Sequence, residues 1–210
     1  MDIDFWHNKW KKNEIGFHMG KANPMLVKHL PIMSLTKGSR IFLPLCGKTL
    51  DISWLLSEGF RVVGSELSEV AIEQLFIELG VEPQLSKSGT LKLFSAENID
   101  IFCGDIFDLS NETLGVVNAI YDRAALVALP KVMRDQYTAH LRKVTNTAPQ
   151  LLISFEYDQN LMEGPPFSVS NDEVKQHYQD YYKISLVENM DIPGGLKGKC
   201  PAEEKVYFLK

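Results

Sequence analysis

The sequence predicts an α/β fold in which a mostly parallel sheet carries helices on both faces. From about residue 40 onward, short β-rich runs alternate with helical runs, the pattern of parallel strands joined by helical crossovers. Near the end of the chain two β-rich runs are separated by a Pro-Gly-Gly turn and no helix, so they are expected to form a hairpin that makes one strand antiparallel. Neither a repeat nor a linker interrupts the pattern, which favours a single domain over residues 1–210.

The first 39 residues differ from the rest of the chain. They are aromatic, polar and mostly helical in pattern, and they precede the first strand. We expect residues 1–39 to form an N-terminal cover segment that folds over the top of the sheet. The sheet core is then expected to occupy residues 40–210.

The strands and helices of the core are predicted from local patterns, in chain order. Buried β-rich runs predict strands at 40–46, 61–67, 99–103, 116–121 and 151–157, an edge strand at 91–94, and the C-terminal pair at 183–188 and 205–209. Helical spacing predicts helices at 49–58, ended by Gly59, at 71–79, with Ser68 as N-cap and Gly80 as C-cap, and at 131–144 after Pro130.

Composition excludes several classes of partner. The formal net charge of −5 argues against nucleic acid, because phosphate binding needs a clustered positive surface. The N-terminus lacks the pattern of a secretory signal, and no run of about 18 apolar residues could span a bilayer. Three widely spaced cysteines make neither a disulfide framework nor a zinc site. We therefore expect a cytoplasmic protein, a monomer, with a small-molecule partner.

Ligands of open α/β sheets bind outside the carboxyl ends of the strands, and the residues there are the site candidates. Glu66 ends the second predicted strand, 19 residues after Gly47, where an acid in nucleoside-binding sheets accepts hydrogen bonds from both ribose hydroxyls. The alternative is a solvated glutamate at a strand end. Gly47 lies in PLCGKT, which is neither GxGxxG nor a P-loop; it permits a tight turn and close approach of the backbone.

Two further strand ends supply candidates with open alternatives. After the third strand, the Asp105 carboxylate could accept from an adenine amino group while Ile106 packs the ring, or Asp105 could cap the following turn. Arg123 ends the fourth strand; it could pair with Asp122 or another neighbour, or hold an anionic ligand with its planar fork.

The aromatic residues of the cover segment are candidates for a lid. Trp10 and Phe17 could exclude water and lie against a cationic ligand, whereas plain packing is favoured for Trp6. The histidines show no metal-binding spacing, so no metal is expected, and Cys46 and Cys103 are interpreted as inert core thiols.

With these positions set out, the chain resembles the thiopurine S-methyltransferase family, particularly its bacterial members. The likeness runs along nearly the whole chain and is carried by FWHNKW with GFH, PLCGKTLDISWL, VVGSELSEVAIEQLF, IFCGDIF, YDRAALVALP, FEYDQ, GPPFSV and EEKVYFL.

The resemblance implies a seven-stranded class I methyltransferase (Rossmann-like) fold with S-adenosyl-L-methionine as methyl donor and S-adenosyl-L-homocysteine as product. It places Trp10, Leu45, Glu66, Ile106 and Arg123 around the cofactor and Phe17 toward the acceptor, and it favours a ligand-binding role for Arg123. There are departures. Ser65 stands where the family usually has an apolar residue, and the loop before the last strand lacks a longer basic stretch, which leaves Lys197 or Lys199 as substitutes.

The implied reaction is transfer of the methyl group to the sulfur of a small heteroaromatic thiol such as a thiopurine. A sulfonium donor is already electrophilic, so the sequence is expected to supply positioning rather than a metal or covalent nucleophile. No residue is nominated as catalytic base, and Arg123 is a candidate for stabilising the acceptor anion. The alternatives are a class I methyltransferase acting on oxygen, nitrogen, selenium or tellurium, and a non-catalytic adenosyl-binding protein.

Overall fold

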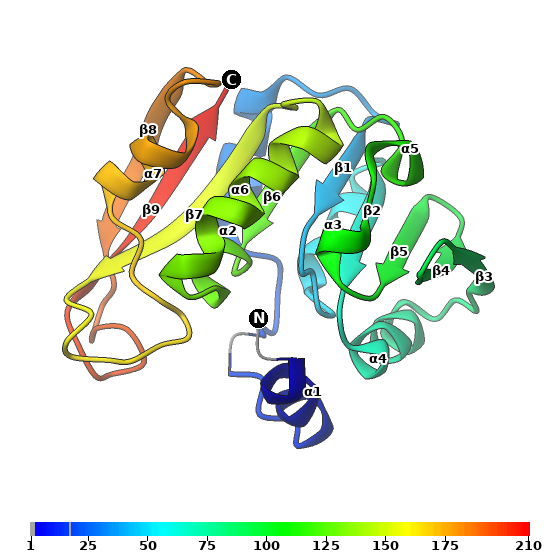
Figure 1. The fold of residues 1–210 in the computed structure, drawn as a ribbon, viewed down its shortest axis with the longest axis horizontal. Coiled ribbons are helices and arrows are strands. Elements are labelled where there is room, and N and C mark those ends of the chain that lie inside the picture. The colour runs from blue at the N-terminus through cyan, green and yellow to red at the C-terminus, as the bar shows by residue number, and fades with distance from the viewer. Residues whose placement is uncertain (1–2, 17) are drawn as a thin grey trace.

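The computed structural model describes residues 3–16 and 18–210, and in this part of the chain nine strands form one sheet (Figure 1). Their order is β3-β4-β5-β2-β1-β6-β7-β9-β8. The strands are β1 Arg40–Leu43, β2 Arg61–Glu66, β3 Gln84–Ser88, β4 Leu91–Ala96, β5 Ile99–Cys103, β6 Ala119–Arg123, β7 Gln150–Tyr157, β8 Ile184–Asp191 and β9 Ala202–Leu209.

The helices of the described residues alternate with these strands. They are α1 Ile3–Lys11, α2 Pro24–His29, α3 Leu50–Ser57, α4 Glu69–Leu79, α5 Asn111–Leu114, α6 Lys131–Thr145 and α7 Asn171–Tyr178, with short 3-10 helices at Leu30–Met33, Ile106–Asp108 and Leu126–Ala128. The predicted caps of α4 are confirmed, because the Ser68 side chain accepts from the Ala71 N–H and Gly80 adopts a left-handed conformation.

The five central strands β5, β2, β1, β6 and β7 are parallel, as predicted. The predicted C-terminal hairpin is also confirmed, since β9 runs antiparallel to both β7 and β8. The chain order of the strands reverses at β1, which pairs with β2 on one side and β6 on the other. The crevice for a ligand is therefore expected beyond the carboxyl ends of β1 and β6.

The strand count is nine rather than the expected seven. The additional pair is the antiparallel hairpin β3–β4, which extends the sheet beyond β5. Residues 91–94 do lie in a strand, but β3 is the edge strand. β3 escaped prediction because its sequence QLSKS is polar and mostly exposed, so no buried face marks it.

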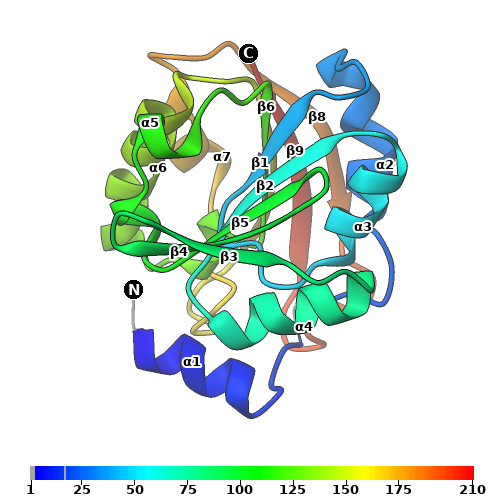
Figure 2. The ribbon, with the colours of Figure 1, turned by 90° about the vertical axis from the view of Figure 1, so that its right-hand side faces the viewer.

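Helices cover both faces of the sheet, as predicted (Figure 2). Apolar side chains from α5, α6 and α7 bury one face, and those from α2, α3 and α4 bury the other. Within the cover segment, α1 belongs to neither layer; it lies beyond the carboxyl ends of the parallel strands and contacts α4 (Figure 1). The following part of the segment instead packs on a sheet face, where Leu26, Leu30 and Met33 join the core.

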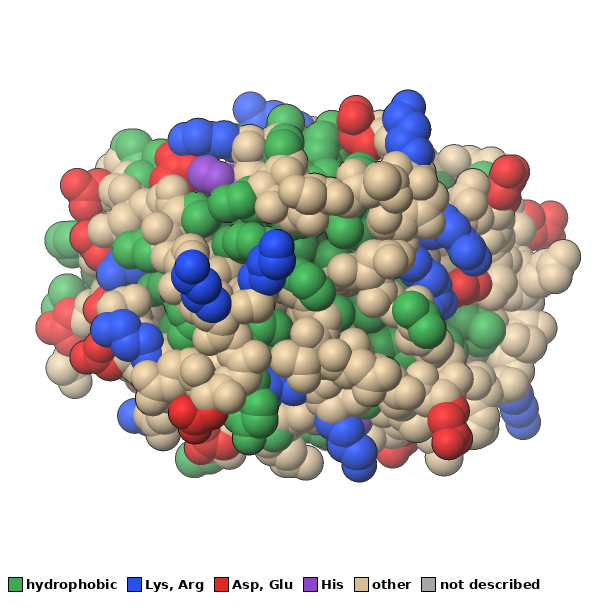
Figure 3. Space-filling view, turned by 90° about the horizontal axis from the view of Figure 1, so that it is seen from above, with side chains coloured by type: hydrophobic (Ala, Val, Ile, Leu, Met, Phe, Trp, Pro, Cys, Tyr) green, Lys and Arg blue, Asp and Glu red, His purple; other side chains and the backbone are tan. Residues whose placement is uncertain are grey.

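The end of the molecule opposite α1 is shown in Figure 3. Lysine and arginine side chains are scattered there among acidic and apolar ones rather than gathered in one patch. Among the described residues, no helix is both long and apolar enough to cross a membrane.

Candidate active site

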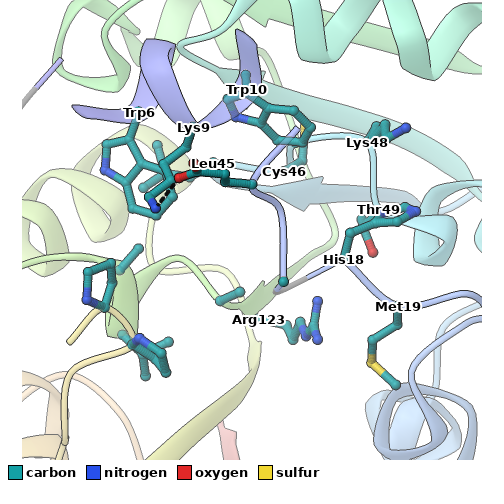
Figure 4. A pocket seen from close by; sticks show the side chains of 18 of the residues that line it. Trp6, Lys9, Trp10, His18, Met19, Leu45, Cys46, Lys48, Thr49 and Arg123 are labelled. Carbon is teal, nitrogen blue, oxygen red and sulfur yellow. Dashed lines mark hydrogen bonds and ion pairs between the residues drawn. The ribbon is translucent and has the colours of Figure 1, made fainter. Parts of the chain in front are cut away.

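A cavity of about 590 Å³ lies at the carboxyl ends of the central strands. In Figure 4, Trp6, Lys9 and Trp10 face it from α1, and Arg123, His18 and Met19 lie on the opposite side. The loop after β1, the ends of β2 and β6, and the turn Gly164–Pro166 complete the wall. Its volume is within the range of about 300–1,000 Å³ typical of small-molecule sites.

The loop after β1 adopts a conformation that turns its backbone across the end of the sheet. Leu45 has φ 47° and Gly47 has φ 54°, so β1 ends at Leu43 and not at residue 46 as predicted. The loop is tied to β2, because the Cys46 N–H donates to the Ser65 carbonyl at 2.9 Å and the Leu45 N–H to the Ser65 hydroxyl at 3.4 Å. Ser65 thus anchors this loop.

Trp10 of α1 closes over Gly47. The indole is 3% exposed, and a β-carbon added at Gly47 would lie 2.9 Å from Cζ2 of Trp10 and 3.1 Å from Cη2. Real β-carbons essentially never lie within 3.0 Å of a heavy atom outside the neighbouring residues, so the approach to Cζ2 is too close. Glycine is therefore required at this position both by the left-handed backbone and by the close packing of the indole.

Glu66 lies at the end of β2, and its carboxyl group lines the cavity. It is 6% exposed, and its two oxygens accept from the Gly47 N–H and the Ser68 N–H, each at 2.8 Å. Burial raises the pKa of Glu66, and the backbone N–H donors oppose that rise. Each carboxylate oxygen retains a further lone pair, so the group can accept from two additional donors such as the hydroxyls of a ribose.

Arg123 lines the cavity at the end of β6 (Figure 4). Its neighbour Asp122 is fully buried and accepts from the Leu126 N–H and the Tyr137 hydroxyl. The wall near Arg123 also holds His18, whose pKa is lowered by burial and by the positive charges of Lys48 and Arg123.

Three sequence candidates lie outside this cavity wall or outside the described residues. Asp105 caps the 3-10 helix that follows it by accepting from the Phe107 N–H at 3.0 Å, which was the structural alternative for it. Ile106 is 2% exposed in the core, and its carbonyl is 2.8 Å from Nε2 of His140. Neither lines the cavity, so their adenine contacts stay predictions. Phe17 lies outside the described residues.

Sequence reasoning missed part of the α1 face. Trp6 lines the cavity although packing was favoured for it, and Lys9 lies beside it and forms an ion pair with Glu14 at 2.6 Å. Trp6, Lys9 and Trp10 stand at i, i+3 and i+4, so they share one face of a helix. That spacing is the signal that could have identified all three.

The opposite rim comes from the GPPF turn and the loop before the last strand. Gly164, Pro165 and Pro166 line the cavity together with Lys197. The Lys197 ammonium donates to the Pro165 carbonyl at 2.7 Å, which joins the two segments. Of the two lysines considered as substitutes for a basic stretch, Lys197 is at this cavity, whereas Lys199 lines a separate shallow hollow.

Cys46, in the loop after β1, and Cys103, at the end of β5, are buried thiols. Burial raises the pKa of Cys46 well above its usual value and that of Cys103 to about 11. A thiol with a raised pKa is a poor nucleophile at neutral pH, in agreement with the interpretation of both as inert. In the described part of the chain, no group of three or more His, Cys, Asp or Glu side chains is arranged to hold a metal ion.

Comparison with known proteins gives a consistent result. The family model for thiopurine S-methyltransferase matches residues 1–210. A thiopurine S-methyltransferase from Xanthobacter autotrophicus is 55% identical over 211 residues, covering 100% of this chain and 99% of the relative. A methyltransferase from Anabaena variabilis has a TM-score of 0.64 at 17% identity, covering 99% of this chain and 95% of that one.

A second solved structure is similar in fold. It is the 1,6-didemethyltoxoflavin-N1-methyltransferase of Burkholderia thailandensis, with its substrate and S-adenosylhomocysteine bound. The TM-score is 0.66 at 13% identity, and the match covers 99% of this chain and 87% of that one. Both structural matches confirm a class I methyltransferase fold.

Proposed function

The chain belongs to the thiopurine S-methyltransferase family of S-adenosylmethionine-dependent methyltransferases, and we propose that it methylates the sulfur of a small heteroaromatic thiol such as a thiopurine. The observation that carries the proposal is the cavity that α1 closes at the carboxyl ends of β1, β2 and β6. A buried carboxylate, an arginine and an indole line this one cavity.

The cofactor is proposed to bind on the β1–β2 side of this cavity. S-adenosylmethionine supplies an electrophilic methyl group on a sulfonium. The residues fit it, because Glu66 keeps acceptor capacity for the ribose hydroxyls after satisfying the Gly47 and Ser68 N–H groups. Leu45 and Gly47 bring the loop backbone to the same wall, and the Trp10 indole can lie against a cation. Asp105 and Ile106 are proposed to contact the adenine beyond the cavity wall.

The acceptor is proposed to lie between Arg123 and the rim formed by Pro165, Pro166 and Lys197. Arg123 stabilises the thiolate with its guanidinium, and Phe17 is proposed to face the acceptor ring. The role of the protein is to exclude water and to hold the acceptor sulfur in line with the methyl group. Such positioning can lower the barrier by about 7–11 kcal/mol. A heteroaromatic thiol with a low pKa is already largely thiolate at neutral pH, so no catalytic base is required.

A panel assay with labelled S-adenosylmethionine tests this proposal. Thiols are compared with ring-matched acceptors that carry hydroxyl or amino groups, and with selenite and tellurite. We expect the highest kcat/KM for heteroaromatic thiols. A higher value for an oxygen, nitrogen, selenium or tellurium acceptor would contradict the sulfur assignment. Binding of S-adenosylhomocysteine without transfer to any acceptor would instead indicate a non-catalytic protein.

Two expectations from the sequence accompany the proposal. A cytoplasmic location and a monomeric state stay predictions. Analytical ultracentrifugation tests the second, for which we expect a single species near the 23.8 kDa chain mass.

A further inference from the structure

A buried carboxylate lies directly behind the cavity wall. Asp122 is 0% exposed and sits on β6 between two residues whose side chains face the other side of the sheet, Tyr121 and Arg123. Asp122 itself points to the face covered by α6, where its partner Tyr137 lies. This face is otherwise apolar along β6, since Ile120 precedes it in the same core cluster.

The Asp122 carboxylate closes the turn that follows β6. One oxygen accepts from the Leu126 N–H at 3.1 Å, which spans the turn from its first residue to its last. The other oxygen accepts from the Tyr137 hydroxyl at 2.8 Å and lies 3.5 Å from the Gln150 side-chain amide nitrogen. The turn is thereby fixed both along the chain and against α6 and β7.

This turn and the 3-10 helix Leu126–Ala128 that follows it carry a substantial part of the cavity wall. Arg123, Ala124, Val127 and Ala128 all line the cavity. Ala124 has φ 63°, a left-handed conformation that a residue with a β-carbon adopts at a cost. The hydrogen bond from Leu126 to Asp122 encloses this strained residue, so it helps to hold the conformation in place.

Burial of the ionised Asp122 carboxylate destabilises the folded protein. The groups that hydrogen-bond to it in the described part of the chain are neutral, and burial raises its pKa to about 6. Because the folded-state pKa lies above that of an unfolded aspartate, the ionised form weakens the folded state at neutral pH. A costly buried charge beside a reacting site is more readily explained by function than by stability.

We propose that Asp122 is a positioning residue whose carboxylate holds the turn after β6, and with it Arg123, in place against the acceptor. The inference rests on the proposed acceptor site beside Arg123. Asp122 is fully buried and does not line the cavity, so it acts through the backbone of the turn.

The titration of Asp122 can be distinguished from that of the side chains that face it. These are Tyr137 from α6, Tyr178 from α7 and Gln150 from β7, and burial raises the pKa of both tyrosines well above 10. Asp122 is then the member of this cluster that gains a proton as the pH falls through about 6. Since the bond from Tyr137 lowers the pKa of Asp122, removing that hydroxyl should raise it. His18 in the cavity wall should not respond to this change.

The first test is Asp122→Asn, with the exposed Asp180→Asn as matched control. At pH 8 we expect the melting temperature of Asp122→Asn to equal or exceed that of the wild type, because a buried charge is removed. We expect kcat/KM for the acceptor to fall roughly 10- to 100-fold, the scale of a small misplacement of reacting groups. Full activity, or a lower melting temperature with unchanged activity per folded molecule, would overturn the proposal.

Tyr137→Phe is the second test and keeps the proposal falsifiable if Asp122→Asn does not fold. We expect the acid limb of its kcat/KM profile to move to higher pH, and an unmoved limb would overturn the proposal. Arg123→Lys distinguishes failure of the positioning role of Asp122 from failure of the proposed function. If it lowers thiol methylation while Asp122→Asn does not, the positioning role fails and the proposed function stands. If the wild type methylates no thiol, the proposed function fails first.

Discussion

Replacing Gly47 by alanine should damage both stability and cofactor binding. Alanine at φ 54° meets the left-handed penalty of about 1–2 kcal/mol, reduced by about 0.4–1 kcal/mol through the smaller entropy of the unfolded chain. Its β-carbon would also lie 2.9 Å from Cζ2 of Trp10, so the indole or the loop must shift. Overpacking of this kind costs about 1–3 kcal/mol. The expected loss of unfolding free energy is therefore about 1–5 kcal/mol, most of it from the overpacking.

Gly80→Ala is the matched control for this experiment. Its φ of 69° imposes a similar backbone penalty, but nothing lies within 4 Å of an added β-carbon. Because the two variants share the backbone penalty and differ by the overpacking, thermal unfolding of this 210-residue chain should show a decrease that is roughly 2–12 °C larger for Gly47→Ala than for Gly80→Ala.

Calorimetry with S-adenosylhomocysteine supplies the second readout of the same pair. We expect its affinity to fall only in Gly47→Ala, because Trp10 and the loop after β1 form the cofactor wall. Equal melting temperatures and equal affinities in the two variants would refute the claim that Gly47 is required by the approach of Trp10.

Three further predictions concern the same cavity. Glu66→Gln should weaken S-adenosylhomocysteine binding by about 1.5–3 kcal/mol, since an amide accepts hydrogen bonds less well than a carboxylate. The exposed Glu73→Gln is the control. Unchanged affinity of Glu66→Gln in calorimetry would exclude the ribose role. Arg123→Lys keeps the charge but loses the planar fork of the guanidinium. If Arg123 stabilises the acceptor anion, turnover should fall most for acceptors of high thiol pKa. A raised KM for S-adenosylmethionine would instead indicate a cofactor contact. Amide hydrogen exchange of residues 3–16 should slow when cofactor product and acceptor are added; identical rates in both states would reduce Trp10 to a packing residue.

Local patterns were sufficient to predict most of the fold. Helix α4 was predicted with its caps because Ser68 and Gly80 act within one turn of the helix ends. The order of buried strands and helices likewise predicted the parallel centre and the terminal hairpin. Strand β3 was missed because its pairing with β4, and not any buried face of its own, stabilises it.

The sequence could predict those residues of the candidate site that lie at the carboxyl ends of strands. Glu66 and Arg123 follow from that rule, since parallel strands bring their carboxyl ends to one edge. Lys197 at the rim depends on how a loop folds back onto the Pro165 carbonyl, which no local pattern encodes. Asp122 left a trace in the sequence, an acid that directly follows Ala119, Ile120 and Tyr121 in β6, but its hydrogen bonds to α6 and to the turn require the tertiary structure.

The central claim is that the methyl group passes from the donor to the sulfur of an acceptor held in this cavity. The most direct measurement uses S-adenosylmethionine with a ¹³C-labelled methyl group, a thiopurine acceptor and nuclear magnetic resonance to locate the label in the product. We expect a labelled methyl group on sulfur, formed at a rate that falls in Arg123→Lys. Label on a ring nitrogen, or transfer to sulfur at an unchanged rate in that variant, would contradict it.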